Sequence, residues 1–172
     1  MGIISVAEVK MSVNEEIRIK IKSELYEVEE SMFSDEDVDL FEAKPSQESP
    51  EADILEINCL GKMIDDGDRI FINYEETEAT GMEGSTTSIS FLKNEPEIVT
   101  MTRDGLVSAT LVFEESKRHH CIYKTPFMPF EVCVKTYGVT NKILTDGTLS
   151  IDYIVEIRGA KAERTKFKMQ IL

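Results

Sequence analysis

Residues 17–22 read Ile-Arg-Ile-Lys-Ile-Lys, a strict alternation of apolar and basic side chains. Such alternation places the apolar side chains on one face of a β-strand and the polar ones on the other. The same period of two recurs at residues 69–74, 88–91, 99–102, 109–113, 149–153 and 167–171. The pattern predicts about 8–10 strands, each with one face turned toward an apolar core.

Turn-forming residues separate these runs at short intervals. They are Asp65-Asp66-Gly67-Asp68, residues 81–84, Asn94-Glu95-Pro96, Asp104-Gly105, Thr125-Pro126 and Asp146-Gly147. Asp104-Gly105 is the clearest hairpin signal, because both central residues of a type I′ turn then tolerate positive φ. Consecutive hairpins favour an antiparallel up-and-down sheet, which removes its exposed edges by closing on itself. We therefore expect an all-β fold: a single antiparallel up-and-down β-barrel.

The charge of the chain is concentrated in one segment. The 172 residues carry 33 Asp+Glu and 19 Lys+Arg, a net charge of −14. Residues 27–53 hold 11 acids and 1 base, so the rest of the chain holds 22 acids and 18 bases, a net of only −4. We predict an N-terminal extension over residues 1–13 and a barrel over 14–172. Within that barrel, residues 31–52 form an acidic insertion between the first two strands.

Two interpretations of the acidic insertion stay open. Its composition is typical of a long solvated loop. Alternatively, apolar residues among the acids form a recognition segment that orders on a protein partner, with Phe33, Val38, Leu40 and Phe41 as anchors.

Composition also limits partners and compartment. The negative charge argues against a nucleic acid or an anionic membrane as the main partner. No apolar run is long enough for a membrane helix, and the N-terminus lacks the features of a signal peptide. The three cysteines, Cys59, Cys121 and Cys133, are odd in number and lie in apolar alternating runs, which fits reduced thiols. We expect a cytoplasmic protein that is a monomer or a weak homodimer.

A series of motifs from residue 74 onward resembles the YwiB-like family of uncharacterised bacterial proteins, mostly from Gram-positive organisms. The motifs, in order, are Tyr74-Glu75-Glu76, residues 81–88, Thr102-Arg103-Asp104-Gly105, Tyr123-Lys124-Thr125-Pro126-Phe127, Gly147-Thr148-Leu149 and Ile151-Asp152-Tyr153. The resemblance implies a calycin or lipocalin-like barrel and a cytoplasmic location, and it implies no activity. The family has a short connection in place of residues 31–52, and often a glycine where this chain has Met128.

Strand phase selects side chains for the barrel lumen. If Ile70, Ile72 and Tyr74 face inward, the period of two carries Glu76 and Glu78 to the same side. Applied to each strand, this reasoning selects a set of polar and aromatic lumen residues: Tyr74, Glu76, Thr87, Arg103, Tyr123 and Tyr153.

Two interpretations of this set compete. Because a buried arginine is costly unless it is paired, Arg103 and Glu76 would form an internal ion pair inside a barrel filled by its own side chains. In the functional interpretation the lumen binds a small anionic or amphipathic ligand, with Arg103 meeting its charge and the tyrosines its apolar body.

Signals for metal binding and catalysis are weak. On a strand, His119 and Cys121 point one way and His120 the other, and the spacings of structural zinc sites are absent, so we expect no metal. Phosphate-binding loops and nucleophile elbows are also missing, and we expect no cofactor. The leading hypothesis is a ligand-binding barrel and the second a protein-interaction module. An enzyme using Glu76 and Arg103 is the least supported.

Overall fold

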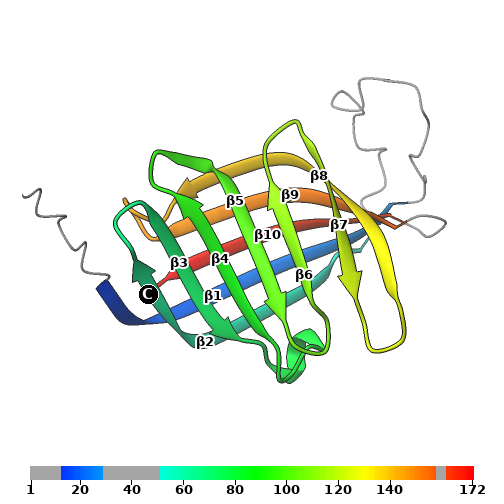
Figure 1. Ribbon diagram of the computed structural model, residues 1–172, viewed down its shortest axis with the longest axis horizontal. Helices are drawn as coiled ribbons and strands as arrows, with labels where there is room; N and C mark the ends of the chain where they lie inside the picture. Colours follow the sequence, from blue (N-terminus) through cyan, green and yellow to red (C-terminus); the bar gives the residue numbers. More distant parts are fainter. Residues whose placement is uncertain (1–12, 29–50, 158–161) are drawn as a thin grey trace, which may run out of the picture.

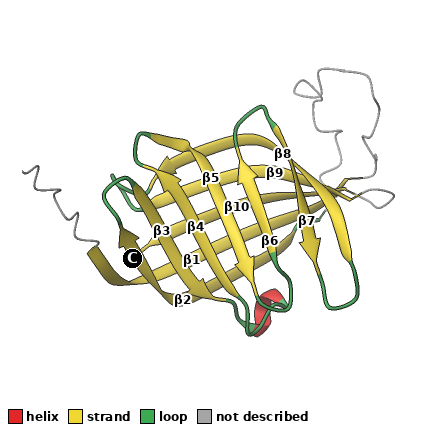
Figure 2. Cartoon of the chain, in the orientation of Figure 1, coloured by secondary structure: helices red, strands yellow, loops and turns green. Residues whose placement is uncertain are grey.

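The computed structural model describes residues 13–28, 51–157 and 162–172. Within them ten strands form one sheet (Figures 1 and 2). The strands are β1 (Val13–Val28), β2 (Asp53–Asp65), β3 (Arg69–Glu75), β4 (Thr86–Leu92), β5 (Glu95–Asp104), β6 (Ala109–Phe113), β7 (Arg118–Lys124), β8 (Pro129–Lys142), β9 (Thr148–Ile157) and β10 (Ala162–Ile171). A short 3₁₀ helix, η2 (Glu78–Thr80), lies between β3 and β4.

All neighbouring strands are antiparallel, in the order β6-β5-β4-β3-β2-β1-β10-β9-β8-β7. Each strand pairs with its neighbours in sequence except at β6 and β7, and β1 also pairs with β10, so the sheet curls round as Figure 1 shows. Two backbone hydrogen bonds bridge the seam between β6 and β7: Ser108 N–H to Lys124 C=O (3.0 Å), and Lys124 N–H to Ser108 C=O (2.9 Å). The predicted all-β, up-and-down antiparallel barrel is therefore confirmed, with ten strands.

The alternating sequence produces the core. Ile17, Ile19 and Ile21 are 8%, 0% and 2% exposed, whereas Arg18 and Lys20 between them are exposed. Full burial of such a side chain stabilises the fold by about 1.5–3 kcal/mol. Fully buried side chains crowd the end of the barrel nearest the β2–β3 and β8–β9 turns: Ile19, Ile70, Phe91, Val99, Leu149 and Met169. This half of the interior is filled by its own side chains.

Gly61 on β2 permits a close contact in this half. A Cβ at this position would lie 2.4 Å from Ile19 Cδ1 and 2.7 Å from the carbonyl oxygen of Asn73. Both distances are shorter than real contacts of a Cβ atom. Ile19 therefore packs directly over the glycine, and any larger residue would displace it.

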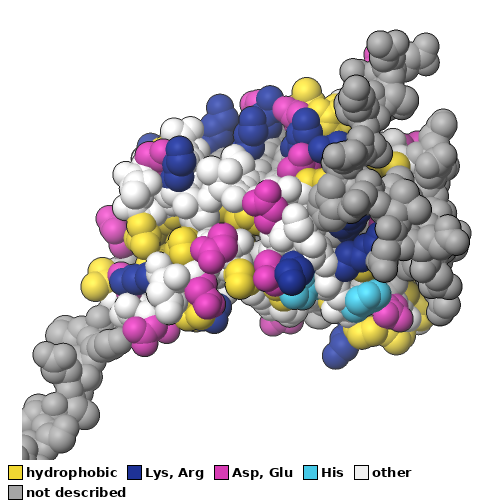
Figure 3. Space-filling model, turned by 90° about the horizontal axis from the view of Figure 1, so that it is seen from above, with side chains coloured by type: hydrophobic (Ala, Val, Ile, Leu, Met, Phe, Trp, Pro, Cys, Tyr) yellow, Lys and Arg dark blue, Asp and Glu magenta, His cyan; other side chains and the backbone are white. Residues whose placement is uncertain are grey.

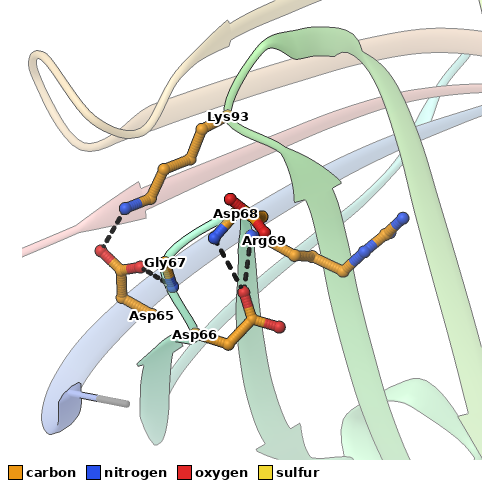
Figure 4. Close-up of polar contacts among 6 residues, drawn as sticks. All are labelled: Asp65, Asp66, Gly67, Asp68, Arg69 and Lys93. Atoms are coloured by element: carbon orange, nitrogen blue, oxygen red, sulfur yellow. Dashed lines mark hydrogen bonds and ion pairs between the residues drawn. The ribbon is translucent and has the colours of Figure 1, made fainter. Parts of the chain in front are cut away.

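The β2–β3 turn at the filled end is fixed by its own acidic side chains (Figure 4). Asp65 accepts a hydrogen bond from Gly67 N–H (2.8 Å), and Asp66 accepts from the N–H groups of Asp68 (3.1 Å) and Arg69 (2.7 Å). Lys93, in the neighbouring β4–β5 turn, lies 2.6 Å from Asp65. The Lys93 ammonium, and then Gly67 N–H, lower the pKa of Asp65. The ion pair joins two adjacent turns.

The hairpin predicted at Asp104-Gly105 is formed by β5 and β6, but its connection is not a type I′ turn. β5 ends at Asp104 and β6 begins at Ala109, so the connection covers residues 105–108, and of the pair only Gly105 has positive φ (153°). The glycine is needed because of a close approach to Ser85 in the β3–β4 connection. A Cβ at Gly105 would lie 2.4 Å from Ser85 Oγ and 2.7 Å from its Cα. The two connections pack together at the other end of the barrel.

The resemblance to the YwiB-like family implies a glycine at the position of Met128, and the structure describes this turn. Met128 lies in the β7–β8 turn, and among the described non-glycine residues only Ser116 has positive φ. Thr125 organises this turn, since its hydroxyl donates to Met128 C=O (2.8 Å) and accepts from Met128 N–H (3.2 Å). The turn therefore does not need a glycine at Met128.

The outer surface of the barrel carries both signs of charge. On the face shown in Figure 3, Lys and Arg side chains are interspersed with Asp and Glu. Most of the predicted N-terminal extension and of the acidic insertion, with Phe33, Val38, Leu40 and Phe41, lies outside the described residues; β1 already begins at Val13. In the described part of the chain, no helix has the length and apolar character needed to cross a membrane.

Candidate functional site

The half of the barrel opposite the filled end contains a cavity of about 390 Å³. It lies where β1 and β9 end and β2 and β10 begin, toward the right-hand end of these strands in Figure 1. Its walls are mainly apolar: Ile21, Leu55, Ile57, Val132, Val155 and Phe167 contribute to them. A cavity of this size and lining falls within the range of small-molecule sites.

Arg103, near the end of β5, lines this cavity. Its Nη1 donates a hydrogen bond of 3.1 Å to the Tyr123 hydroxyl, and its Nε is buried without a hydrogen-bond partner. Among the described residues that line the cavity, Arg103 is the one basic side chain. Burial by itself lowers the pKa of Arg103, but Tyr123, Tyr153, Tyr74 and Glu76 together raise it above its ordinary value, so the guanidinium stays charged.

Glu76 follows β3 and also lines the cavity, with 6% of its surface exposed. Its Oε1 accepts a hydrogen bond of 2.5 Å from the Thr87 hydroxyl. No ion pair joins Glu76 to Arg103 among the ion pairs of the described residues, so the expected internal pair is not formed. Each group faces the cavity with its charge not directly neutralised by the other.

Two residues assigned by strand phase to the inner side of the sheet do not line the cavity: Thr87, from the predicted lumen set, and Glu78. Thr87 has the predicted inward phase but is 0% exposed and does not line the cavity, because it lies behind Glu76 and supports it. Glu78 is exposed, because the chain leaves the sheet after Glu76 and enters η2, where the period of two no longer applies.

Three tyrosines line the cavity with Arg103 and raise the pKa of its guanidinium: Tyr74, Tyr123 and Tyr153. Burial raises the pKa of both Tyr74 and Tyr153. Their hydroxyl groups therefore stay protonated at neutral pH and can donate hydrogen bonds. Tyr123 stacks on Phe130 with a ring separation of 5.7 Å, which holds its hydroxyl toward Arg103.

Sequence reasoning missed polar residues on β10. Glu163 and Thr165 line the cavity. Counting back in steps of two from the inward-facing Phe167 would have found both of them. Glu163 is exposed to solvent at the rim, yet partial burial raises its pKa, and the carboxylates of Glu27 and Asp53 raise it further. Glu27 lies directly opposite Glu163 in the β1–β10 ladder, so this part of the cavity rim is acidic.

The histidines have the alternation expected on β7. His119 lies 3.1 Å from Glu114, and His120, which is more exposed, lies 3.1 Å from Glu131. Within the described ranges, no group of three or more His, Cys, Asp or Glu side chains is arranged to hold a metal ion. The thiols of Cys59, Cys121 and Cys133 are free, and burial raises the pKa of each.

The sequence from residue 42 to residue 169 matches the family model described as domain of unknown function DUF1934. The chain belongs to this family. No curated protein matches the chain. The fold is similar to the crystal structure of the ywiB protein from Bacillus subtilis, with a TM-score of 0.65 and 14% sequence identity over 92% of this chain and 93% of that chain. The YwiB-like resemblance seen in the sequence is thus confirmed, and at this identity the structural match establishes the fold alone.

Proposed function

We propose that this DUF1934 protein binds a small amphipathic anion in the open half of its barrel. The proposal rests on one observation above the others. A cavity of about 390 Å³ contains a charged guanidinium that forms no ion pair with a carboxylate of the described residues, although Glu76 raises its pKa. Removing an arginine from water without pairing it is costly. A bound anion would supply the missing partner.

The apolar walls define the rest of the ligand. Leu55, Ile57, Val132 and Val155 line the cavity together with Arg103 and the tyrosines Tyr74, Tyr123 and Tyr153. An apolar body would therefore contact the aliphatic wall while its charged head contacts Arg103. The free thiols support a reducing compartment, so we place this binding activity in the cytoplasm.

Native mass spectrometry tests the proposal. The purified protein is weighed under native and denaturing conditions, as isolated and after incubation with octanoate, octyl phosphate or octanol. We expect an added mass that is lost on denaturation and absent from Arg103→Met. Arg118→Met is the matched control, because Arg118 is an exposed residue of β7. If neither the isolated protein nor any incubated sample carries added mass, the proposal is wrong.

A further inference from the structure

The hydrogen bonds of Arg103 leave one edge of its guanidinium free. A guanidinium has five N–H donors in a planar fork. The Tyr123 hydroxyl accepts a hydrogen bond from Nη1, while neither Nε nor Nη2 donates to a described residue. In the planar group, the Nε–H and one Nη2–H point in the same direction. The spacing of these two N–H groups matches that of the two oxygens of a carboxylate, which arginine binds in a bidentate manner.

The charges around the cavity favour a head group with one negative charge over a head group with two. Arg103 supplies one positive charge, and the two acidic residues Glu76 and Glu163 line the same cavity among the described residues. A head group with two negative charges would face one cation and two carboxylates, and like charges in a partly desolvated site repel strongly. A monoanion needs no more than the one cation present.

We infer that the ligand is a monocarboxylate with an apolar chain or ring, held by the Nε–Nη2 edge of Arg103. This inference rests on the proposed function, since it specifies the head group of the anion in the same cavity. The hydrogen bond from Nη1 to Tyr123 orients the guanidinium, which makes Tyr123 a positioning residue for the carboxylate.

Calorimetric titration at pH 8 with octanoate, octyl phosphate and octanol tests the inference. The three probes share one chain, and at this pH their head groups carry one negative charge, two negative charges and none. Octanoate is expected to bind at least tenfold more tightly than octyl phosphate. The Arg103→Met variant should bind octanoate about 10- to 100-fold more weakly, the usual effect of losing a charge-assisted hydrogen bond. The same variant should bind octanol as the unmodified protein does.

Two further variants keep the test decisive if Arg103→Met folds poorly. Arg103→Lys keeps the charge but loses the fork, and Tyr123→Phe keeps Arg103 but loses its orienting hydroxyl. Each should weaken octanoate binding severalfold and leave octanol binding unchanged. If octyl phosphate binds as tightly as octanoate, the carboxylate assignment is wrong and the anion-binding function stands. If no octyl probe binds at millimolar concentration, the proposed function fails together with the inference.

Discussion

The side chains of Arg103 and Tyr123 are joined across the seam of the barrel. Arg103 lies on β5 and Tyr123 on β7, and their 3.1 Å hydrogen bond spans the opening between β6 and β7 from the inside. The backbone bridge between Ser108 and Lys124 crosses the same seam. One hydrogen bond therefore serves both the closure of the barrel and the orientation of the cation in its cavity.

Removing the hydroxyl of Tyr123 is expected to weaken the fold as well as the binding of octanoate. In Tyr123→Phe the ring and its stacking on Phe130 remain, while Arg103 loses its one described hydrogen-bond acceptor. An unsatisfied buried donor costs about 1–3 kcal/mol. The free energy of unfolding in urea should fall by an amount in this range. An unchanged value would show that the hydrogen bond does not contribute to closure of the barrel.

Gly61→Ala tests the packing of the filled half. The new methyl group would overlap Ile19 and the backbone oxygen of Asn73, and overpacking of this kind costs about 1–3 kcal/mol. Thermal and urea unfolding should both show this loss of stability. Gly138→Ala is the control, because a Cβ there meets nothing within 4 Å. Equal stability of the two variants would show that the close packing of Ile19 on Gly61 is not needed.

Glu163→Gln is expected to stabilise the protein at neutral pH. Burial, Glu27 and Asp53 raise the pKa of Glu163, so the folded protein favours the protonated carboxyl. The ionised carboxylate therefore opposes folding above this raised pKa, and the penalty disappears as the pH falls below the ordinary value of 4.5. The increase in the free energy of unfolding over that of the unmodified protein, measured with urea, should be largest at pH 7 and vanish near pH 4. A gain that is independent of pH would contradict this explanation.

Lys93→Met should make the protein less sensitive to acid. The Lys93 ammonium and Gly67 N–H lower the pKa of Asp65, so this carboxylate stabilises the fold above its ordinary pKa of 3.8 and loses that effect as the pH falls further. Stability curves of the variant and the unmodified protein should converge in strong acid and separate toward neutral pH. Parallel curves at all pH values would show that the ion pair in Figure 4 contributes nothing.

Strand phase in the sequence predicted the side of the sheet on which each residue lies, but not its depth in the barrel. Ile70, Ile72 and Tyr74 correctly placed Glu76 inside. The same rule failed at Glu78, where the strand had ended, and it could not show that Glu76 covers Thr87. Period two describes a continuous strand and contains no information about which inward side chains lie behind others.

The sequence alone could not predict whether the barrel contains a cavity. Whether a barrel is filled depends on the summed volumes and rotamers of side chains from every strand. In this barrel side chains such as Phe91 and Ile70 fill one half, while the open half keeps a cavity whose walls include both small side chains such as Val132 and large ones such as Phe167. The missing ion pair between Arg103 and Glu76 likewise depends on side-chain geometry, which no spacing of residues encodes.

A crystal structure of the protein with octanoate tests the central claim most directly. We expect the carboxylate inside the barrel, with an oxygen roughly 3 Å from Nε or Nη2 of Arg103. The alkyl chain should lie against Leu55, Ile57 and Val132. A lumen that holds only water at saturating octanoate, or a carboxylate bound away from Arg103, would contradict the claim.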